Sequence, residues 1–118
     1  YDMRFPRLYN ALANAGASLM AVPAAFTVPT GEAHWHVLLR ARAIETGSYV
    51  IAAAQGGQHP NGRATYGHSL VIDPWGRIVA ELPHDAPGVL VAEIDPALVS
   101  DARSRIPALA NARDFAIG

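Results

Sequence analysis

Arg4 is the residue near the start of the chain with the clearest chemical potential. It lies in the stretch "YDMRFP", two residues before Pro6, which suits the first position of a helix. A helix start favours anions, and a guanidinium placed there can grip a carboxylate with paired hydrogen bonds. Thr30 stands at the start of a second predicted helix and offers a hydroxyl. Arg4 and Thr30 together predict a clasp for an acidic substrate; the alternative is an internal Asp2–Arg4 ion pair.

A serine nucleophile is suggested by Gly67-His68-Ser69 with Asp73 nearby, but the pattern is incomplete. A nucleophile elbow needs Gly at both ends of G-x-S-x-G, and Val71 replaces the second one. His68 and Ser69 are adjacent on a predicted strand, so their side chains point to opposite faces. The sequence therefore favours a buried, hydrogen-bonded His68 over a catalytic one.

The remaining polar pairs favour structural roles. His34 and His36 are about 200° apart on a helix and cannot share a metal ion, so no metal is expected and His34 is placed beside Trp35 in a packed corner. Arg42 and Glu45 are spaced i, i+3, as in a structural ion pair. The Gly-rich stretch 55–67 has neither a dinucleotide-binding nor a P-loop pattern, so no cofactor is expected. The chain contains no Cys and therefore no thiol nucleophile.

The elements that must position these residues alternate between helix and strand. Apolar periodicity predicts helices over 5–15 and from about Thr30 to Gly47, and Asp95-Pro96 begins another that runs to about Ile106. Five apolar runs are predicted strands: 18–22, 49–54, 69–72, 77–80 and 89–94. Residues 23–29 and 55–67 are predicted loops. The order indicates one α/β domain with helices on one side of a sheet.

The composition indicates which partners and which location to expect for this domain. Of the 118 residues, 51% are hydrophobic and 16% are charged, whereas a soluble domain averages about 25% charged residues. Much of the surface is therefore expected to be covered by other protein. The net charge is -1 and the nine basic residues, all Arg, are scattered, which argues against nucleic acid and anionic membranes. No apolar run approaches the roughly 18 residues of a membrane span, and a cytoplasmic location is expected.

Several long motifs carry a family resemblance. The stretches "YDMRFPRLY", "AFTVPTGEAHWHVLLRARAIET", "VIAAAQGGQHPNG", "YGHSLVIDPWG" and "VAEIDPALV" resemble the C-terminal portion of the nitrilase superfamily of carbon–nitrogen hydrolases. They are most similar to the branch that hydrolyses deaminated glutathione and to the omega-amidases. The resemblance implies an α/β fold, the four-layer αββα sandwich, of which 1–118 would be the C-terminal half. It also implies an N-terminal half of the same protein as partner, and a homodimer or higher oligomer.

The resemblance also implies a mechanism and site residues. In the family a Cys nucleophile comes immediately before the position of Tyr1, and a Lys and two Glu residues lie earlier still. The backbone amide of Tyr1 would stabilise the oxyanion, Arg4 and Thr30 would contact the substrate carboxylate, and Phe26 would form an aromatic wall. Arg7 departs from the family, which usually has Glu there.

The implied activity is hydrolysis of a small, carboxylate-bearing amide through a Cys thioester. Two alternatives stay open. The first is a carbamoyl-amino-acid hydrolase of the same superfamily. The second is a non-catalytic assembly or binding module on the same scaffold.

Overall fold

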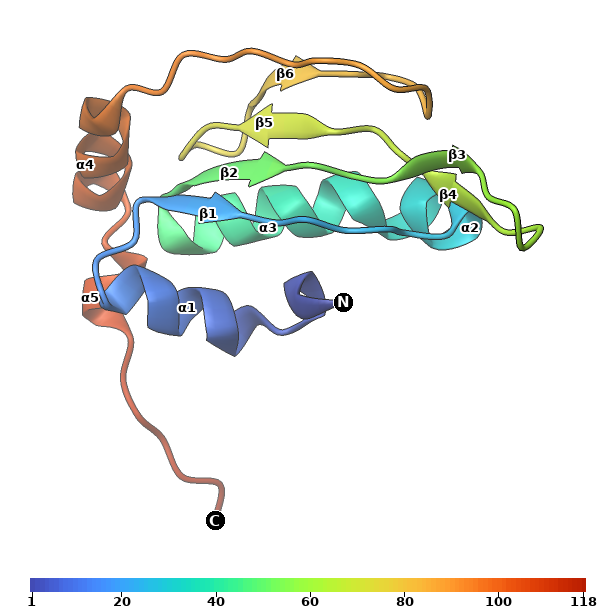
Figure 1. Cartoon of the computed structure of the whole chain (residues 1–118). Coiled ribbons are helices and arrows are strands. Elements are labelled where there is room, and N and C mark those ends of the chain that lie inside the picture. The colour runs from blue at the N-terminus through green and yellow to red at the C-terminus, as the bar shows by residue number, and fades with distance from the viewer.

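A four-stranded sheet organises the computed structural model, which describes all 118 residues (Figure 1). The strand order is β1-β2-β5-β6, formed by Leu19–Ala21, Tyr49–Ala52, Leu70–Ile72 and Ile78–Glu81. β1 and β2 are parallel, whereas β5 and β6 each run antiparallel to their neighbour. Helix α3, His36–Thr46, connects the parallel pair, as such a pair requires. These four strands confirm four of the five predicted ones, with ends that differ by one or two residues.

Two of the three predicted helices cover one face of this sheet, as predicted (Figure 1), whereas the last one packs against the other face. α1, Pro6–Asn14, and α3 lie on the same side, and the main core forms between them and the strands. Trp35 and Leu39 are fully buried against strand residues such as Val50 and Leu70. Alternate residues of β1, β2 and β5 point into this core because the side-chain period of a strand is two. Gly47 ends α3 in the left-handed conformation, with φ 57°.

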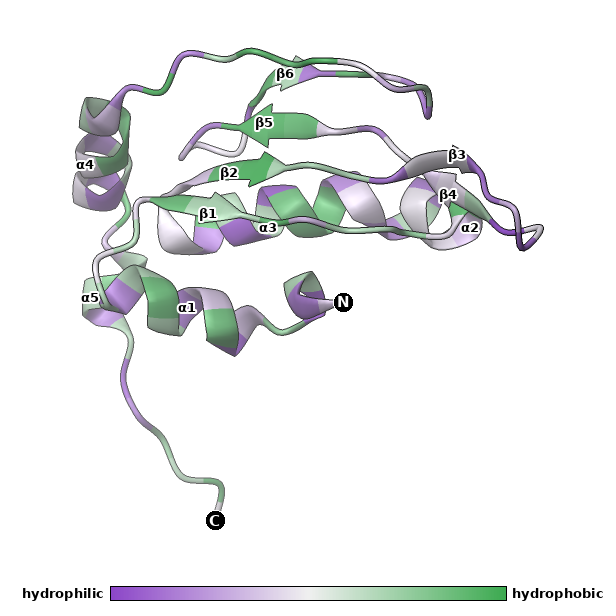
Figure 2. Cartoon of the chain, viewed as in Figure 1, coloured by the Kyte–Doolittle hydropathy of each residue, from purple (hydrophilic) through white to green (hydrophobic).

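The opposite face of the sheet is only partly covered. Tyr49 and Val71 form a small cluster there with Val99 of helix α4, Pro96–Arg105. Leu19 and Ile51 remain 44% and 36% exposed, and Figure 2 shows apolar colour along these strands. The molecule is a slab of 46 × 41 × 20 Å with a radius of gyration of 15.3 Å, against about 13.5 Å for a compact domain of this length. The slab has the thickness of one helix layer on one sheet.

The prediction that Val89–Ile94 forms a strand of the sheet is wrong. The segment is extended and alternates as a strand does, with Leu90, Ala92 and Ile94 packed on the Tyr49 cluster. It makes no backbone–backbone hydrogen bond, however. A period of two indicates extended backbone with one buried face, but a ladder also needs a neighbouring strand. α4 follows as predicted, with the Asp95 carboxylate accepting a 3.0 Å hydrogen bond from the Ala97 amide.

The predicted loop 55–67 contains an antiparallel hairpin, β3 Gly56–Gln58 and β4 Ala64–Tyr66. Asn61-Gly62 lies in its turn, where Gly62 has φ 81°. The hairpin lacks the apolar alternation that would reveal its strands, so its glycines suggested a loop.

The helix predicted from Thr30 begins earlier and is irregular. A short α2, Val28–Thr30, leads into a π-helical turn, Gly31–Trp35, and then into α3. A last short helix, α5, comprises Ala108–Asn111. None of the helices combines the length and the apolar character needed to span a bilayer.

Candidate functional site

Arg4 lies at the end of a 3-10 turn, Asp2–Arg4, immediately before α1. Its guanidinium carbon is 5.1 Å from the centre of the Phe26 ring and 5.6 Å from that of Tyr1. One terminal nitrogen, Nη2, lies 3.2 Å from Nδ1 of His34. None of the ion pairs involves Arg4, so the alternative Asp2–Arg4 pair does not form. The structure thus brings three of the predicted site residues together. The rings of Tyr1 and Phe26 lie beside the guanidinium of Arg4, which has no carboxylate partner.

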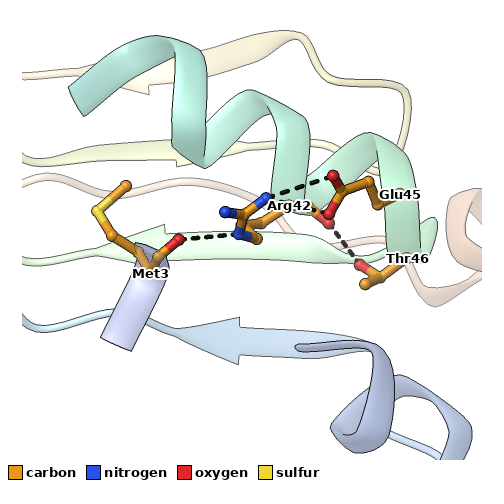
Figure 3. A network of polar contacts seen from close by, with 4 residues as sticks. All are labelled: Met3, Arg42, Glu45 and Thr46. Atoms are coloured by element: carbon orange, nitrogen blue, oxygen red, sulfur yellow. Dashed lines mark hydrogen bonds and ion pairs between the residues drawn. The ribbon is translucent and has the colours of Figure 1, made fainter. Parts of the chain in front are cut away.

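Arg42 of α3 fixes the turn that carries Arg4 (Figure 3). Its Nε donates a 2.9 Å hydrogen bond to the carbonyl of Met3, the residue just before Arg4. Its Nη1 bonds both carboxylate oxygens of Glu45, at 3.1 and 3.3 Å, which confirms the predicted ion pair. Thr46 donates a further bond of 2.7 Å to the Arg42 carbonyl. The start of the chain is therefore attached to a buried side chain of the neighbouring helix.

Tyr9 of α1 packs beside the same arginine, with the Arg42 guanidinium 6.0 Å from its ring centre. Burial raises the pKa of the Tyr9 phenol, and the Asp2 carboxylate raises it further, whereas Arg42 acts in the opposite direction. The buried surroundings therefore favour the neutral phenol.

Phe26 is fixed in position because its ring packs against Trp35 and its backbone is hydrogen-bonded. The ring is 8% exposed and lies 5.0 Å from that of Trp35. The Trp35 indole donates a 2.8 Å hydrogen bond to the carbonyl of His68, and the Phe26 carbonyl accepts one of 2.9 Å from the Tyr66 amide. A buried indole N–H of this kind needs such a partner.

Thr30 bonds within its own turn. Its hydroxyl lies 2.7 Å from that of Thr27 and donates to the Thr27 carbonyl at 3.2 Å. It makes no hydrogen bond to Arg4. Thr30 belongs to the same helical segment as His34, four residues further on, and His34 is the residue that contacts Arg4 directly.

The prediction that His34 is packed in the protein interior is wrong. Trp35 takes the buried position, and His34 is exposed and contacts Arg4 instead. Adjacent helical residues point about 100° apart, so only one of the two enters the core. The spacing i, i+4 from Thr30 was the signal that placed His34 on the same side of the helix, and sequence reasoning missed it.

The other histidines have structural partners. His36 Nε2 bonds the carboxylate of Glu81. His68, half-buried rather than buried, donates from Nδ1 to the Tyr66 carbonyl, and the Ser69 hydroxyl accepts a 3.0 Å bond from the Ala54 amide. These contacts agree with the structural interpretation of His68 and Ser69. No three His, Asp or Glu side chains gather into a group that could hold a metal ion.

Comparison with known proteins identifies the family of this chain. The family model described as carbon-nitrogen hydrolase matches residues 1–104. The human protein named deaminated glutathione amidase is 53% identical over 113 residues, which are 96% of this chain and 34% of that protein. The crystal structure of the C. elegans NitFhit protein superimposes with a TM-score of 0.91 at 48% identity, over 96% of this chain and 27% of that one.

A more distant structure carries chemical information. A mutant of the amidase from Nesterenkonia sp. AN1, with a TM-score of 0.71 and 33% identity, holds the acetamide moiety of fluoroacetamide added covalently at its active site cysteine. That match covers 91% of this chain and 40% of the amidase. The chain thus spans about a third to two fifths of the length of most of these relatives. It belongs to the carbon–nitrogen hydrolase family, within the nitrilase superfamily, with deaminated glutathione amidases among its relatives.

Proposed function

We propose that this chain supplies the substrate-carboxylate site of an amidase that hydrolyses small, carboxylate-bearing amides of the deaminated glutathione or omega-amide type. The observation that carries the proposal is Arg4, a cation stacked on Phe26 and free of any carboxylate partner. A guanidinium in this state can bind a substrate carboxylate by donating two parallel hydrogen bonds. Family membership and the names of the relatives support the reaction class.

In the proposed reaction the complete protein supplies the nucleophile from an N-terminal half. The acid–base Glu takes the proton of a Cys thiol before Tyr1, and the thiolate forms a bond to the amide carbon. The C–N bond then breaks, and the leaving group takes that proton from the Glu and departs as an amine, or as ammonia from an omega-amide. Water deprotonated by the same Glu then attacks the thioester, which releases the acid and restores the thiol. The cysteine adduct in the Nesterenkonia amidase supports a thiol nucleophile.

Tyr1 and Thr30 have supporting roles in this proposal. The backbone amide of Tyr1, together with the Lys of the N-terminal half, stabilises the negative oxygen of the tetrahedral intermediate. The Thr30 hydroxyl offers a donor to the substrate carboxylate when it turns away from Thr27. Phe26 forms the apolar wall against which the substrate chain lies.

The uncovered face of the sheet suggests where the N-terminal half binds. Leu19 and Ile51 expose apolar surface that a second sheet would bury, completing the αββα sandwich. Assembly into a homodimer and a cytoplasmic location complete the proposal, and the low charge fraction of 16% supports extensive coverage by other protein.

The test uses the complete protein and two amides of equal length, glutaramate, which carries a carboxylate, and pentanamide, which does not. Ammonia release is measured for the unsubstituted protein, for Arg4→Ala and for the control Arg7→Ala, which removes an exposed arginine of α1. Two charge-assisted hydrogen bonds correspond to a loss of roughly a hundredfold in kcat/KM. Arg4→Ala should lose about that factor on glutaramate only. An equal loss on both amides would show that Arg4 is structural.

A further inference from the structure

We infer that His34 determines carboxylate specificity by holding the Arg4 guanidinium in its binding orientation, an inference that rests on the proposed function. The contact that carries it joins Nδ1 of His34 to Nη2 of Arg4 at 3.2 Å. The two residues come from elements 30 positions apart, the N-terminal turn and the helical segment before α3. It is the only side-chain hydrogen bond of Arg4 in the structure.

The direction of this hydrogen bond fixes the state of the histidine. Arginine has five N–H donors, no acceptor, and does not lose its proton in proteins. Nδ1 of His34 must therefore accept, so its lone pair faces Arg4 and the ring proton lies on Nε2. In this arrangement His34 is a neutral imidazole.

A neutral acceptor suits a carboxylate site better than a charged one. Asp or Glu at position 34 would also accept from Arg4, but its negative charge would compete with the substrate for the guanidinium. Lys or Arg there would repel Arg4 and could not accept at all. Neutral His34 takes one N–H of Nη2 and leaves the full positive charge, with the other four N–H donors, for the substrate.

The aromatic contacts and the histidine restrict different motions of the guanidinium. Phe26 and Tyr1 lie within 5.1 and 5.6 Å of its carbon and limit where the group sits. The His34 bond sets which edge faces outward, because it fixes one of the two terminal nitrogens. Preorganisation of this kind lowers the entropy lost when a carboxylate binds, since an arginine side chain has much rotamer freedom.

Two variants of the complete protein distinguish the hydrogen-bond acceptor of the His34 side chain from its volume. His34→Asn keeps an acceptor oxygen near the position of Nδ1, whereas His34→Leu removes it and keeps apolar volume. His84→Leu, which changes another exposed histidine, is the matched control. The removal of one hydrogen bond to a charged group corresponds to about tenfold. His34→Leu should raise KM for glutaramate by about that factor, with kcat and the rate on pentanamide nearly unchanged, and His34→Asn should restore most of it.

The inference is overturned if His34→Leu affects both amides equally, leaves KM for glutaramate unchanged, or is no worse than His34→Asn. Glutarate binding, measured by calorimetry on the same proteins, distinguishes failure of the inference about His34 from failure of the proposed function. A complete protein that releases neither ammonia from glutaramate nor amine from an N-alkyl glutaramate removes the proposed function. Glutarate affinity then still decides the role of His34: a loss of about tenfold in His34→Leu supports it, and equal affinity or no glutarate binding to the unsubstituted protein refutes it.

Discussion

The link between Arg42 and Met3 gives the most direct test of how the site is built. The side chain of Arg42 is only 5% exposed. Arg42→Met keeps a long, flexible side chain at this position but removes the guanidinium. Besides the guanidinium's contact with the Tyr9 ring, two polar interactions are lost. One is the 2.9 Å hydrogen bond to the Met3 carbonyl, in a residue that is 1% exposed; the other is the pair with Glu45, whose side chain is 40% exposed.

The two losses differ in size because their exposure differs. A charge-assisted hydrogen bond to a buried carbonyl is worth about 1.5–3 kcal/mol, since the carbonyl is left without a partner. The pair with the exposed Glu45 adds at most about 1 kcal/mol after solvent screening. Arg42→Met should therefore lower the free energy of unfolding by about 2–4 kcal/mol. Glu45→Gln, which removes only the ion pair, should cost less than about 1 kcal/mol.

Urea denaturation of the complete protein, followed by circular dichroism, measures both changes from the shift in midpoint at constant slope. The same Arg42→Met protein should show a higher KM for glutaramate, because the turn carrying Arg4 is less firmly held. Equal destabilisation by Arg42→Met and Glu45→Gln would refute the reasoning, since it would mean that the Met3 contact contributes nothing.

Three further changes test the fold around the site. Gly31→Ala would place a Cβ 2.2 Å from Cγ of Tyr66, and it should lower the melting temperature through a loss of about 3 kcal/mol; an unchanged melting temperature would contradict the close packing. Asp73→Ala removes carboxylate bonds to the amides of Trp75 and Arg77 at 2.9 and 3.0 Å. It should cost about 2–3 kcal/mol in urea titrations, and Asp101→Ala, in an exposed pair, should cost under about 0.5 kcal/mol. Tyr9 has its pKa raised from 10.0 in the folded state, so its contribution to stability is present below the pKa of the unfolded chain and is lost as pH rises through the folded value. Tyr9→Phe should therefore weaken the fall in urea midpoint above about pH 10, and an identical fall in both proteins would exclude Tyr9 as its source.

Elements with strong periodicity or clear end signals could be predicted from the sequence. Pro6 begins α1, Asp95-Pro96 begins α4, and Gly47 ends α3. Local chemistry fixes these positions whatever the rest of the chain does. The Arg42–Glu45 pair follows from helical spacing for the same reason.

Features that depend on distant residues could not be predicted in the same way. The alternation in Val89–Ile94 is real, but strand pairing depends on a neighbour that local sequence does not reveal. His34 contacts Arg4 because the turn at Asp2–Arg4 packs beside the helix that follows Thr30. The bond from Arg42 to the Met3 carbonyl was also missed, because a backbone acceptor carries no sequence signal.

The extended segment Val89–Ile94 has a consequence for handling the chain. Its amides and carbonyls make no backbone hydrogen bonds, and Val89 and Val91 are 87% and 85% exposed. An apolar, unpaired edge of this kind is a template on which a strand of another molecule can add, and it promotes aggregation. Backbone amides from 89 to 94 should exchange rapidly with solvent deuterium while this edge is open and slowly once a strand pairs with it. Hydrogen–deuterium exchange at these few residues would therefore measure the occupancy of the edge directly.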